Sequence, residues 1–224
     1  MPTDSHARAA RLDALFGAPA FAVAFAVLCN CLWGSAFPFI KLGYRLFAID
    51  SADTASILCF AGVRFMLGSV LVLLASFALE GRRPALPRGR VLAECCALGL
   101  WQTTAQYAFY YAAVALLTGA FGGILNSTQS FLGVILAHFC MMAATVIFTS
   151  SGPWNKSVTK KADSFMVCCL NLGVGGAALL AIGLLMGGSL APQSPLGIPV
   201  LLYLAFVSGA GYVLWALLMK NNPV

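Results

Sequence analysis

Charged residues are scarce in this sequence. Lys, Arg, Asp and Glu make up only 9% of the 224 residues, whereas 61% of the residues are hydrophobic. Such a chain lacks the polar surface that a water-soluble domain needs, so a lipid bilayer is the solvent that suits it. The composition therefore predicts a polytopic membrane protein, and the lipid bilayer is one of its expected partners.

The sequence also lacks the motifs of enzymes and metal sites. It has no H-x-x-x-H pair, no nucleophile elbow and no phosphate-binding glycine loop. The eight cysteines occur mostly as C-x-C and C-C pairs within apolar runs, which match no zinc or disulfide framework. We therefore expect no enzymatic activity, no metal and no cofactor. The net charge of +6 is divided among short clusters, so we expect no nucleic-acid partner.

Long apolar runs are what the sequence does contain. They predict an all-α fold, a bundle of about six transmembrane helices, because lipid excludes isolated strands. The first run continues well past twenty residues, so it reads as a retained span and not as a cleaved signal peptide. The predicted spans lie near residues 19–41, 55–79, 91–116, 120–150, 164–187 and 197–219.

The fourth apolar run is too long for a simple span. At about 1.5 Å per residue, residues 120–150 would extend roughly 46 Å as one helix, against a hydrocarbon core of ~30 Å. We expect either one long helix here or two pieces broken near Gly152-Pro153.

Basic residues predict how the chain is oriented. If the spans alternate, ten cations fall on one side, and the opposite loops hold Lys41, Arg45, Asp50 and Asp53. The positive-inside rule then places both termini in the cytoplasm, in a plasma-membrane protein, with residues 1–18 as a cytoplasmic N-terminal segment. The ten cations are Arg8, Arg11, Arg82, Arg83, Arg88, Arg90, Lys156, Lys160, Lys161 and Lys220.

Three pairs of short segments recur in the same order along the chain. The first pair shares a P-x-x-K pattern, at Pro38 and again at Pro153. Repetition in this order, with the copies entering the membrane from opposite sides, is typical of inverted-repeat transporters. The paired segments are 35–41 with 150–156, 64–69 with 171–176, and 103–110 with 208–215.

Four stretches, Leu32–Lys41, Val63–Leu67, Tyr107–Ala113 and Tyr203–Trp215, carry a resemblance to a known family. With them the chain resembles the EamA-domain permeases of the drug/metabolite transporter superfamily. The resemblance implies two inverted five-helix repeats around a central cavity.

This chain is shorter than the family pattern. Residues 126–139 resemble the fourth helix of the family and residues 140–161 the sixth, and two further helices would be expected after Val224. We therefore expect a first repeat of four spans at 19–139 and an incomplete second repeat at 140–224.

The leading hypothesis is a permease that moves small metabolites or drug-like molecules by alternating access through a central cavity. The alternative is a truncated, transport-inactive membrane protein that acts as an interaction module or requires a partner. A homodimer is possible in either case, because a second copy could restore the missing packing faces.

Polar and aromatic residues inside the spans are the candidates for a site. Arg64, the only cation well inside a span, could bind an anionic substrate or could snorkel outward. A stripe containing Thr103 and Gln106 could line a pore or could hydrogen-bond between helices, and Asn126 and Gln129 allow the same two interpretations. The substrate-cavity candidates are Trp33, Ser35, Arg64, Gln102, Thr103, Gln106, Tyr107, Tyr110, Asn126, Gln129, Asn171, Tyr212 and Trp215, and the helix-kink candidates are Pro38 and Pro153.

Overall fold

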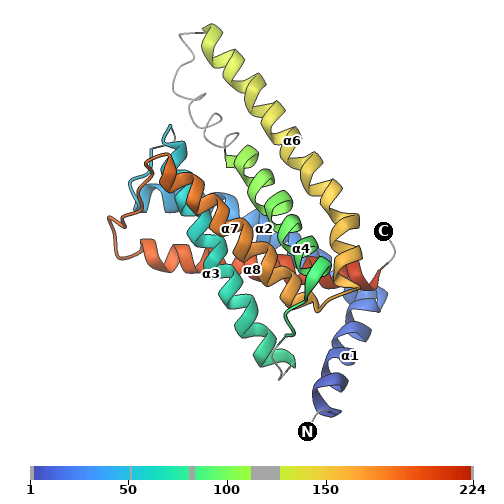
Figure 1. The fold of residues 1–224 in the computed structure, drawn as a ribbon. Coiled ribbons are helices and arrows are strands. Elements are labelled where there is room, and N and C mark those ends of the chain that lie inside the picture. The colour runs from blue at the N-terminus through green and yellow to red at the C-terminus, as the bar shows by residue number, and fades with distance from the viewer. Residues whose placement is uncertain (1–2, 51, 81–83, 112–126, 223–224) are drawn as a thin grey trace.

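The fold is a bundle of helices (Figure 1). The structure is a computed structural model that describes residues 3–50, 52–80, 84–111 and 127–222. Within these residues it contains helices and loops but no strand, which confirms the all-α prediction. The elements are α1 (Thr3–Gly17), α2 (Pro19–Leu46), α3 (Thr54–Glu80), α4 (Gly89–Leu98), the π-helix η1 (Gly99–Ala105), α6 (Ser127–Thr159), α7 (Ser164–Leu185) and α8 (Gly197–Asn221).

Four of the described helices are long and apolar enough to cross a membrane. They are α2, α3, α7 and α8, which contain the candidate spans Pro19–Leu46, Thr54–Leu79, Ser164–Leu185 and Gly197–Asn221. These helices coincide with four of the six predicted spans, at 19–41, 55–79, 164–187 and 197–219. The chain is therefore a multi-pass membrane protein.

The third predicted span, 91–116, begins in α4 and runs on through η1. Helical structure continues from residue 106 to residue 111, and residues 112–116 lie outside the described part. A π-helix is wider than an α-helix because each of its hydrogen bonds closes over five residues. This widening was not predicted, and it changes the direction in which the polar side chains of this span point.

The fourth predicted span appears as one long helix. Helix α6 contains 33 residues and continues through Pro153, so the prediction of a single piece is the one that the structure shows. At 1.5 Å per residue the helix is roughly 50 Å long. Residues 120–126 lie outside the described part. Helix α6 also crosses residues 139 and 140 without a break, and the division into two repeats at that point stays a prediction.

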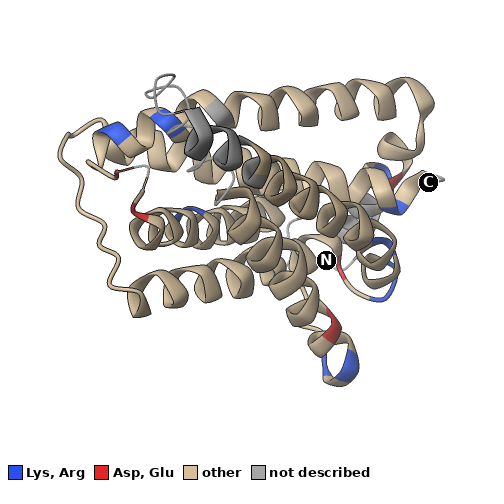
Figure 2. Cartoon of the chain, turned by 90° about the horizontal axis from the view of Figure 1, so that it is seen from above, with Lys and Arg blue, Asp and Glu red and all other residues tan. Residues whose placement is uncertain are grey.

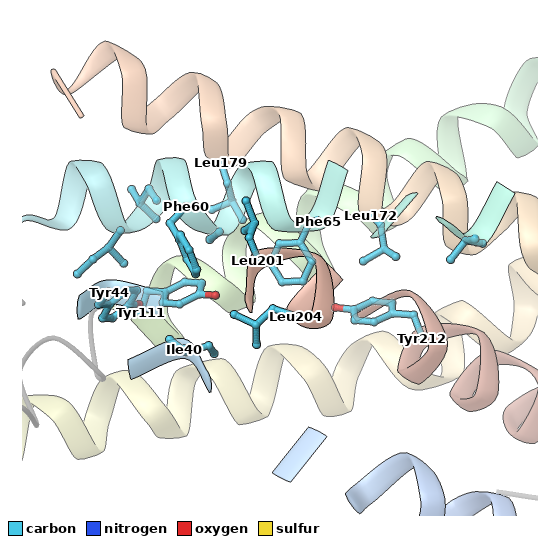
Figure 3. Close-up of a cluster of buried hydrophobic side chains, with 14 of the residues drawn as sticks. Ile40, Tyr44, Phe60, Phe65, Tyr111, Leu172, Leu179, Leu201, Leu204 and Tyr212 are labelled. Atoms are coloured by element: carbon cyan, nitrogen blue, oxygen red, sulfur yellow. The ribbon is translucent and has the colours of Figure 1, made fainter. Parts of the chain in front are cut away.

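Helices α3 and α7 pack closely at the centre of the bundle. A Cβ atom placed on Gly62 of α3 would lie 2.5 Å from the backbone nitrogen of Leu180, and one on Gly176 of α7 would lie 3.0 Å from the carbonyl of Gly62. Small residues of this kind let two membrane helices approach each other. Buried apolar side chains such as Phe60 and Leu179 fill the space beside this contact (Figure 3).

Polar contacts tie together the helix ends at one end of the bundle. Lys220 Nζ of α8 lies 2.8 Å from Asp13 Oδ2 of α1, and Lys161 Nζ lies 2.8 Å from Glu94 Oε2 of α4. Most charged residues lie near the helix ends, as Figure 2 shows. The segments predicted to share one side of the membrane therefore meet at one end.

The loops predicted on the opposite side meet at the other end. The backbone nitrogen of Gln193, between α7 and α8, donates to the carbonyl of Leu46 at 2.9 Å, and that of Ser189 donates to Ser56 Oγ at 3.0 Å. Asp53 accepts a hydrogen bond from the backbone of Ser56 at the start of α3. Hydrogen bonding to Ser56 holds the pKa of Asp53 below its usual range.

Candidate functional site

Five parts of the chain surround a cavity of about 210 Å³ inside the bundle. They are α2, α3, the helical segment 106–111, α6 and α8, so the cavity lies where most of the long helices converge. Its lining combines one cation, aromatic rings and amide or hydroxyl groups. The lining residues are Trp33, Ala36, Ile40, Arg64, Gln106, Tyr107, Tyr110, Phe148, Val207 and Ser208.

Arg64 is the charged group of this cavity. It lies ten residues after Thr54, roughly 15 Å along α3, which places it near the middle of a span. Its side chain does not snorkel outward, because the residue is only 3% exposed. Its guanidinium carbon lies 4.3 Å from the ring centre of Phe65 and 5.6 Å from that of Tyr107. The electron-rich ring faces attract the cation and take the place of part of its water shell.

The guanidinium group keeps donors that the described residues do not use. Its Nε and Nη1 atoms have no hydrogen-bond partner within the described part of the chain. The sequence also explains why no carboxylate of the described residues pairs with it: no acid occurs from residue 54 to residue 79, and none occurs in the segment 112–126. The seven acids are Asp4, Asp13, Asp50, Asp53, Glu80, Glu94 and Asp163.

Tyrosine rings lie close to Arg64. Tyr107, Tyr110 and Tyr111 come from one helical segment, and their ring centres lie 5.5–5.9 Å apart. Tyr44 of α2 lies beside Tyr111 at one end of the buried cluster, and the hydroxyl of Tyr212 is directed toward its middle (Figure 3). The Tyr44, Tyr111 and Tyr212 hydroxyls are buried without a hydrogen-bond partner among the described residues. The cluster thus contains hydrogen-bonding capacity that the described fold leaves unused.

Three further residues with polar groups, Trp33, Gln106 and Ser208, line the cavity. Gln106 Oε1 and Trp33 Nε1 are buried and have no partner within the described residues. Ser208 Oγ donates to the carbonyl of Leu204 at 2.9 Å, in its own helix. The cavity therefore offers a cation, an indole N–H and an amide to a molecule inside it.

A second group of predicted cavity residues joins helices and does not line the cavity. Thr103 Oγ1 donates to Asn171 Oδ1 at 2.6 Å, and Asn171 Nδ2 donates to Gln102 Oε1 at 2.8 Å. Asn155 of α6 also donates to Gln102, at 3.3 Å. All four side chains are buried. This network connects η1, α6 and α7, which is the interhelical role that the sequence also allowed.

The remaining aromatic candidates adjoin the cavity through Trp33. The Trp33 ring centre lies 5.7 Å from that of Trp215 and 6.4 Å from that of Tyr212. Phe148 of α6 completes the group, at 5.5 Å from Trp33 and 5.7 Å from Trp215. This aromatic group joins α2, α6 and α8 beside the cavity.

The other predicted residues have separate places. Ser35 Oγ forms a hydrogen bond of 2.8 Å with the Tyr203 hydroxyl, and neither residue is among those that line the cavity. Pro38 and Pro153 lie inside helices that continue past them. Asn126 lies outside the described residues. Gln129 lies in α6, where its backbone alone is described.

Sequence reasoning missed part of the cavity. Phe148 and Ser208 line it, and Tyr44 adjoins Arg64, but none of them was a candidate. Ser208 and Tyr44 are isolated polar residues in or near apolar runs. Hydropathy cannot distinguish such a residue in a cavity from one that packs between helices. Phe148 gives no signal in the sequence, because a phenylalanine in an apolar run can face lipid as readily as it can face a cavity.

Three further cavities are larger. One of about 320 Å³ is lined mostly by apolar residues of α2 and α8 such as Ala22 and Leu218, and the other two are also less suited to a polar ligand in the membrane. One, of about 470 Å³, lies at the charged end beside Lys160 and Asp163. The other, of about 480 Å³, is lined by apolar residues of α2, α3, α7 and α8 such as Leu71 and Val213. Within the described residues no group of three or more His, Cys, Asp or Glu could hold a metal ion.

Comparison with known protein families gives a match to part of the chain. Residues 137–224 match the EamA-like transporter family, which agrees with the resemblance to EamA-domain permeases seen in the sequence. That family implies a membrane transporter of the drug/metabolite superfamily. No curated protein and no solved structure matches the chain. The match covers fewer than half of the residues, so what is established is a multi-pass membrane protein whose C-terminal part is similar to the EamA-like transporter family.

Proposed function

We propose that this protein is a permease that moves a small molecule across the membrane by alternating access through the cavity around Arg64. The observation that carries the proposal is a buried cation at mid-span that lines a cavity between helices. Transport changes no covalent bond of the substrate, so the proposal includes no catalytic step.

The energetic cost of Arg64 supports a functional role. A charged residue at the centre of a membrane helix costs about 2.5–3.5 kcal/mol on insertion scales. A leucine at this position would avoid that cost and would still pack against Phe65. An intramembrane ionisable residue that faces a cavity is therefore a functional-site hypothesis by default.

The helices around the cavity suit an alternating mechanism. Helices α2, α3 and the segment 106–111 belong to the predicted first repeat, whereas α8 belongs to the predicted second repeat. Rocking of one group against the other would open the cavity to either side in turn. The aromatic contacts of Trp33 with Phe148 and Trp215 join α2 to α6 and α8, so we propose that they separate in one of the two open states.

We further propose that the protein lies in the plasma membrane with both termini in the cytoplasm. The support is the clustering of cationic loops, because the contacts of Lys161 and Lys220 lie at one end of the bundle. The positive-inside rule assigns that end to the cytoplasm. A homodimer and the two-repeat organisation remain part of the same proposal.

Flux into proteoliposomes tests the proposal. Purified protein is reconstituted and challenged with a panel of anionic, neutral and cationic metabolites, and uptake is compared with that of protein-free liposomes. Wild type is expected to move at least one compound, and Arg64→Gln is expected to lose most of that flux.

The matched control is Arg90→Gln, which makes the same change at a side chain that is 92% exposed. It is expected to transport at the wild-type rate. Absence of flux for every compound, from a protein shown to be folded and inserted, would contradict the proposal and favour the transport-inactive alternative.

A further inference from the structure

We infer that the cavity binds a small organic monoanion with a flat, unsaturated body, whose carboxylate pairs with Arg64 and whose body lies against the aromatic walls. The inference rests on the proposed function in one respect, namely that this cavity is the substrate site. It adds the chemical class of the ligand.

Charge balance sets the sign and the number of charges on the ligand. Arg64 is the only Lys, Arg, Asp or Glu among the described lining residues. No acid occurs in its own span, and the segment 112–126 contains none either. Of the acids in described contacts, Glu94 pairs with Arg90 and Lys161, and Asp13 pairs with Lys220. The cavity therefore carries one uncompensated positive charge, which a monoanion would neutralise.

The form of the cation favours a carboxylate. A guanidinium group presents N–H donors in a planar fork that matches the two oxygens of a carboxylate. Nε and Nη1 of Arg64 lie on different edges of the guanidinium, and neither has a partner in the described part of the chain, although the residue is only 3% exposed. Either edge therefore has a donor left for a carboxylate oxygen. Donors that have lost their water gain most from a charged acceptor.

The aromatic walls favour a flat body. Four of the lining residues, Trp33, Tyr107, Tyr110 and Phe148, are aromatic. Aromatic pairs prefer stacked or edge-to-face contacts, so rings arranged around a cavity favour an unsaturated plane over a bulky aliphatic group. The volume of about 210 Å³ lies below the ~300–1,000 Å³ of pockets for drug-sized ligands, which limits the ligand to about one ring.

Calorimetric titration of the purified protein in lipid nanodiscs tests the inference without any measurement of flux. The probe is phenylacetate. Phenylacetamide has the same shape without the charge, and acetate has the charge without the ring. We expect phenylacetate to bind wild type at millimolar concentration or below, and both other compounds to bind roughly thirtyfold more weakly or not at all.

Substitutions at Arg64 provide the second comparison. Arg64→Gln is expected to weaken phenylacetate binding roughly thirtyfold or more, and Arg64→Lys to weaken it less, because lysine keeps the charge but loses the planar fork. Arg90→Gln, at an exposed arginine, is expected to bind phenylacetate as wild type does. If the Arg64 variants do not fold, the comparison of the three ligands on wild type still decides the question.

Equal binding of phenylacetate and phenylacetamide would overturn the inference, and so would the absence of phenylacetate binding at millimolar concentration. The outcome separates from that of the transport proposal. If cationic or neutral compounds are transported but phenylacetate does not bind, the transport proposal stands and the anion site is contradicted. Phenylacetate binding by a protein that moves nothing would support the anion site and contradict transport.

Discussion

Asn171 joins α7 to η1 through side-chain hydrogen bonds. Its side chain accepts from Thr103 and donates to Gln102, and all three residues are buried. In a membrane the bundle gains little from apolar contact between helices, because lipid is equally apolar. Hydrogen bonds of this kind therefore hold particular helices together and fix how they face each other.

Replacing Asn171 with alanine is expected to destabilise the bundle. The substitution removes the acceptor of Thr103 and one of the donors to Gln102, which we expect to cost about 1 kcal/mol or more. The measurement is the unfolding midpoint in detergent, followed by circular dichroism.

Asn30→Ala is the matched control for this residue. Its side chain is exposed and bonds only to the carbonyl of Ala26 in its own helix, at 2.8 Å. The control is expected to unfold at nearly the wild-type midpoint. Equal midpoints for Asn171→Ala and wild type would show that the network does not stabilise the bundle.

The polar stripe of this span shows how far sequence spacing reaches at the residue scale. The spacing of Thr103, Gln106, Tyr107 and Tyr110 indicated one helical face, with either a cavity or a helix contact beside it. The structure divides the stripe between these two roles: Thr103 contacts α7, and the other three line the cavity. Spacing could not show the division, because it depends on which neighbouring helix lies beside each turn. Which of these residues bind substrate stays a prediction.

Hydropathy located the interiors of the helices better than their ends. The predicted span 55–79 matches α3 closely, whereas α2 continues five residues past the predicted end at residue 41. Lys41 and Arg45 lower the mean hydropathy there although the backbone stays helical. Helix α1 was not predicted at all, because its charged sequence carries no apolar run, and it is held by contacts such as Asp13 with Lys220.

The π-helix η1 is the element that was hardest to predict from the sequence. Its residues Gly99–Ala105 carry no motif that distinguishes a π-turn from an α-turn. The physical reason is that η1 is in tertiary contact with α7, which is distant in the sequence. A Cβ on Gly99 would lie 2.8 Å from the carbonyl of Asn171, so η1 and α7 touch backbone to backbone. Such a contact involves two helices that are far apart in the sequence, and a local pattern cannot reveal it.

Gly175 is the residue of α7 at which this contact is tightest. A Cβ there would lie 2.4 Å from Thr103 Cβ and 2.6 Å from the Gly99 carbonyl. We expect Gly175→Ala to force α7 away from η1 and to lower stability by about 1–3 kcal/mol. The unfolding midpoint in detergent measures this.

Gly34→Ala is the control for that substitution. Gly34 lies inside α2, and its added Cβ would meet nothing within 4 Å. Since alanine favours a helix over glycine by about 0.5–1 kcal/mol, this variant is expected to be as stable as wild type or slightly more so. If Gly175→Ala behaved like Gly34→Ala, the close contact of α7 with η1 would not be a determinant of stability.

At the scale of the whole molecule, the charged ends of the helices predict the orientation in the membrane. A cysteine introduced at Gln193, in an exposed position between α7 and α8, is expected to react with an impermeant maleimide from outside the cell. A cysteine introduced at the exposed residue Lys160 is expected to react only in inverted vesicles.

The parent protein, with its eight native cysteines, provides the background in both preparations. Reaction of both positions from the same side would contradict the alternating topology. Reaction with the two sides exchanged would keep the topology but would place the termini outside.

The bundle as a whole followed from composition and hydropathy, whereas its internal organisation did not. Few charges and long apolar runs were sufficient to predict membrane helices, because the requirement for a paired backbone in lipid is absolute. The predicted repeat boundary at residues 139 and 140 falls inside the continuous helix α6. No helix begins or ends there, so the positions of the helix ends do not test this boundary. The family match begins at residue 137, close to that boundary.

The length of α6 makes the surrounding bilayer part of the structure. A helix of 33 residues, roughly 50 Å long, exceeds a hydrocarbon core of ~30 Å and has to lean or to draw the nearby lipid thicker. Either adjustment costs a fraction of a kcal/mol for each ångström of mismatch. Because Phe148 of α6 lines the cavity, lipids with longer acyl chains would let α6 stand more upright and would reshape that wall. Acyl-chain length is thus expected to act on the cavity as an effector does, although no lipid need enter it.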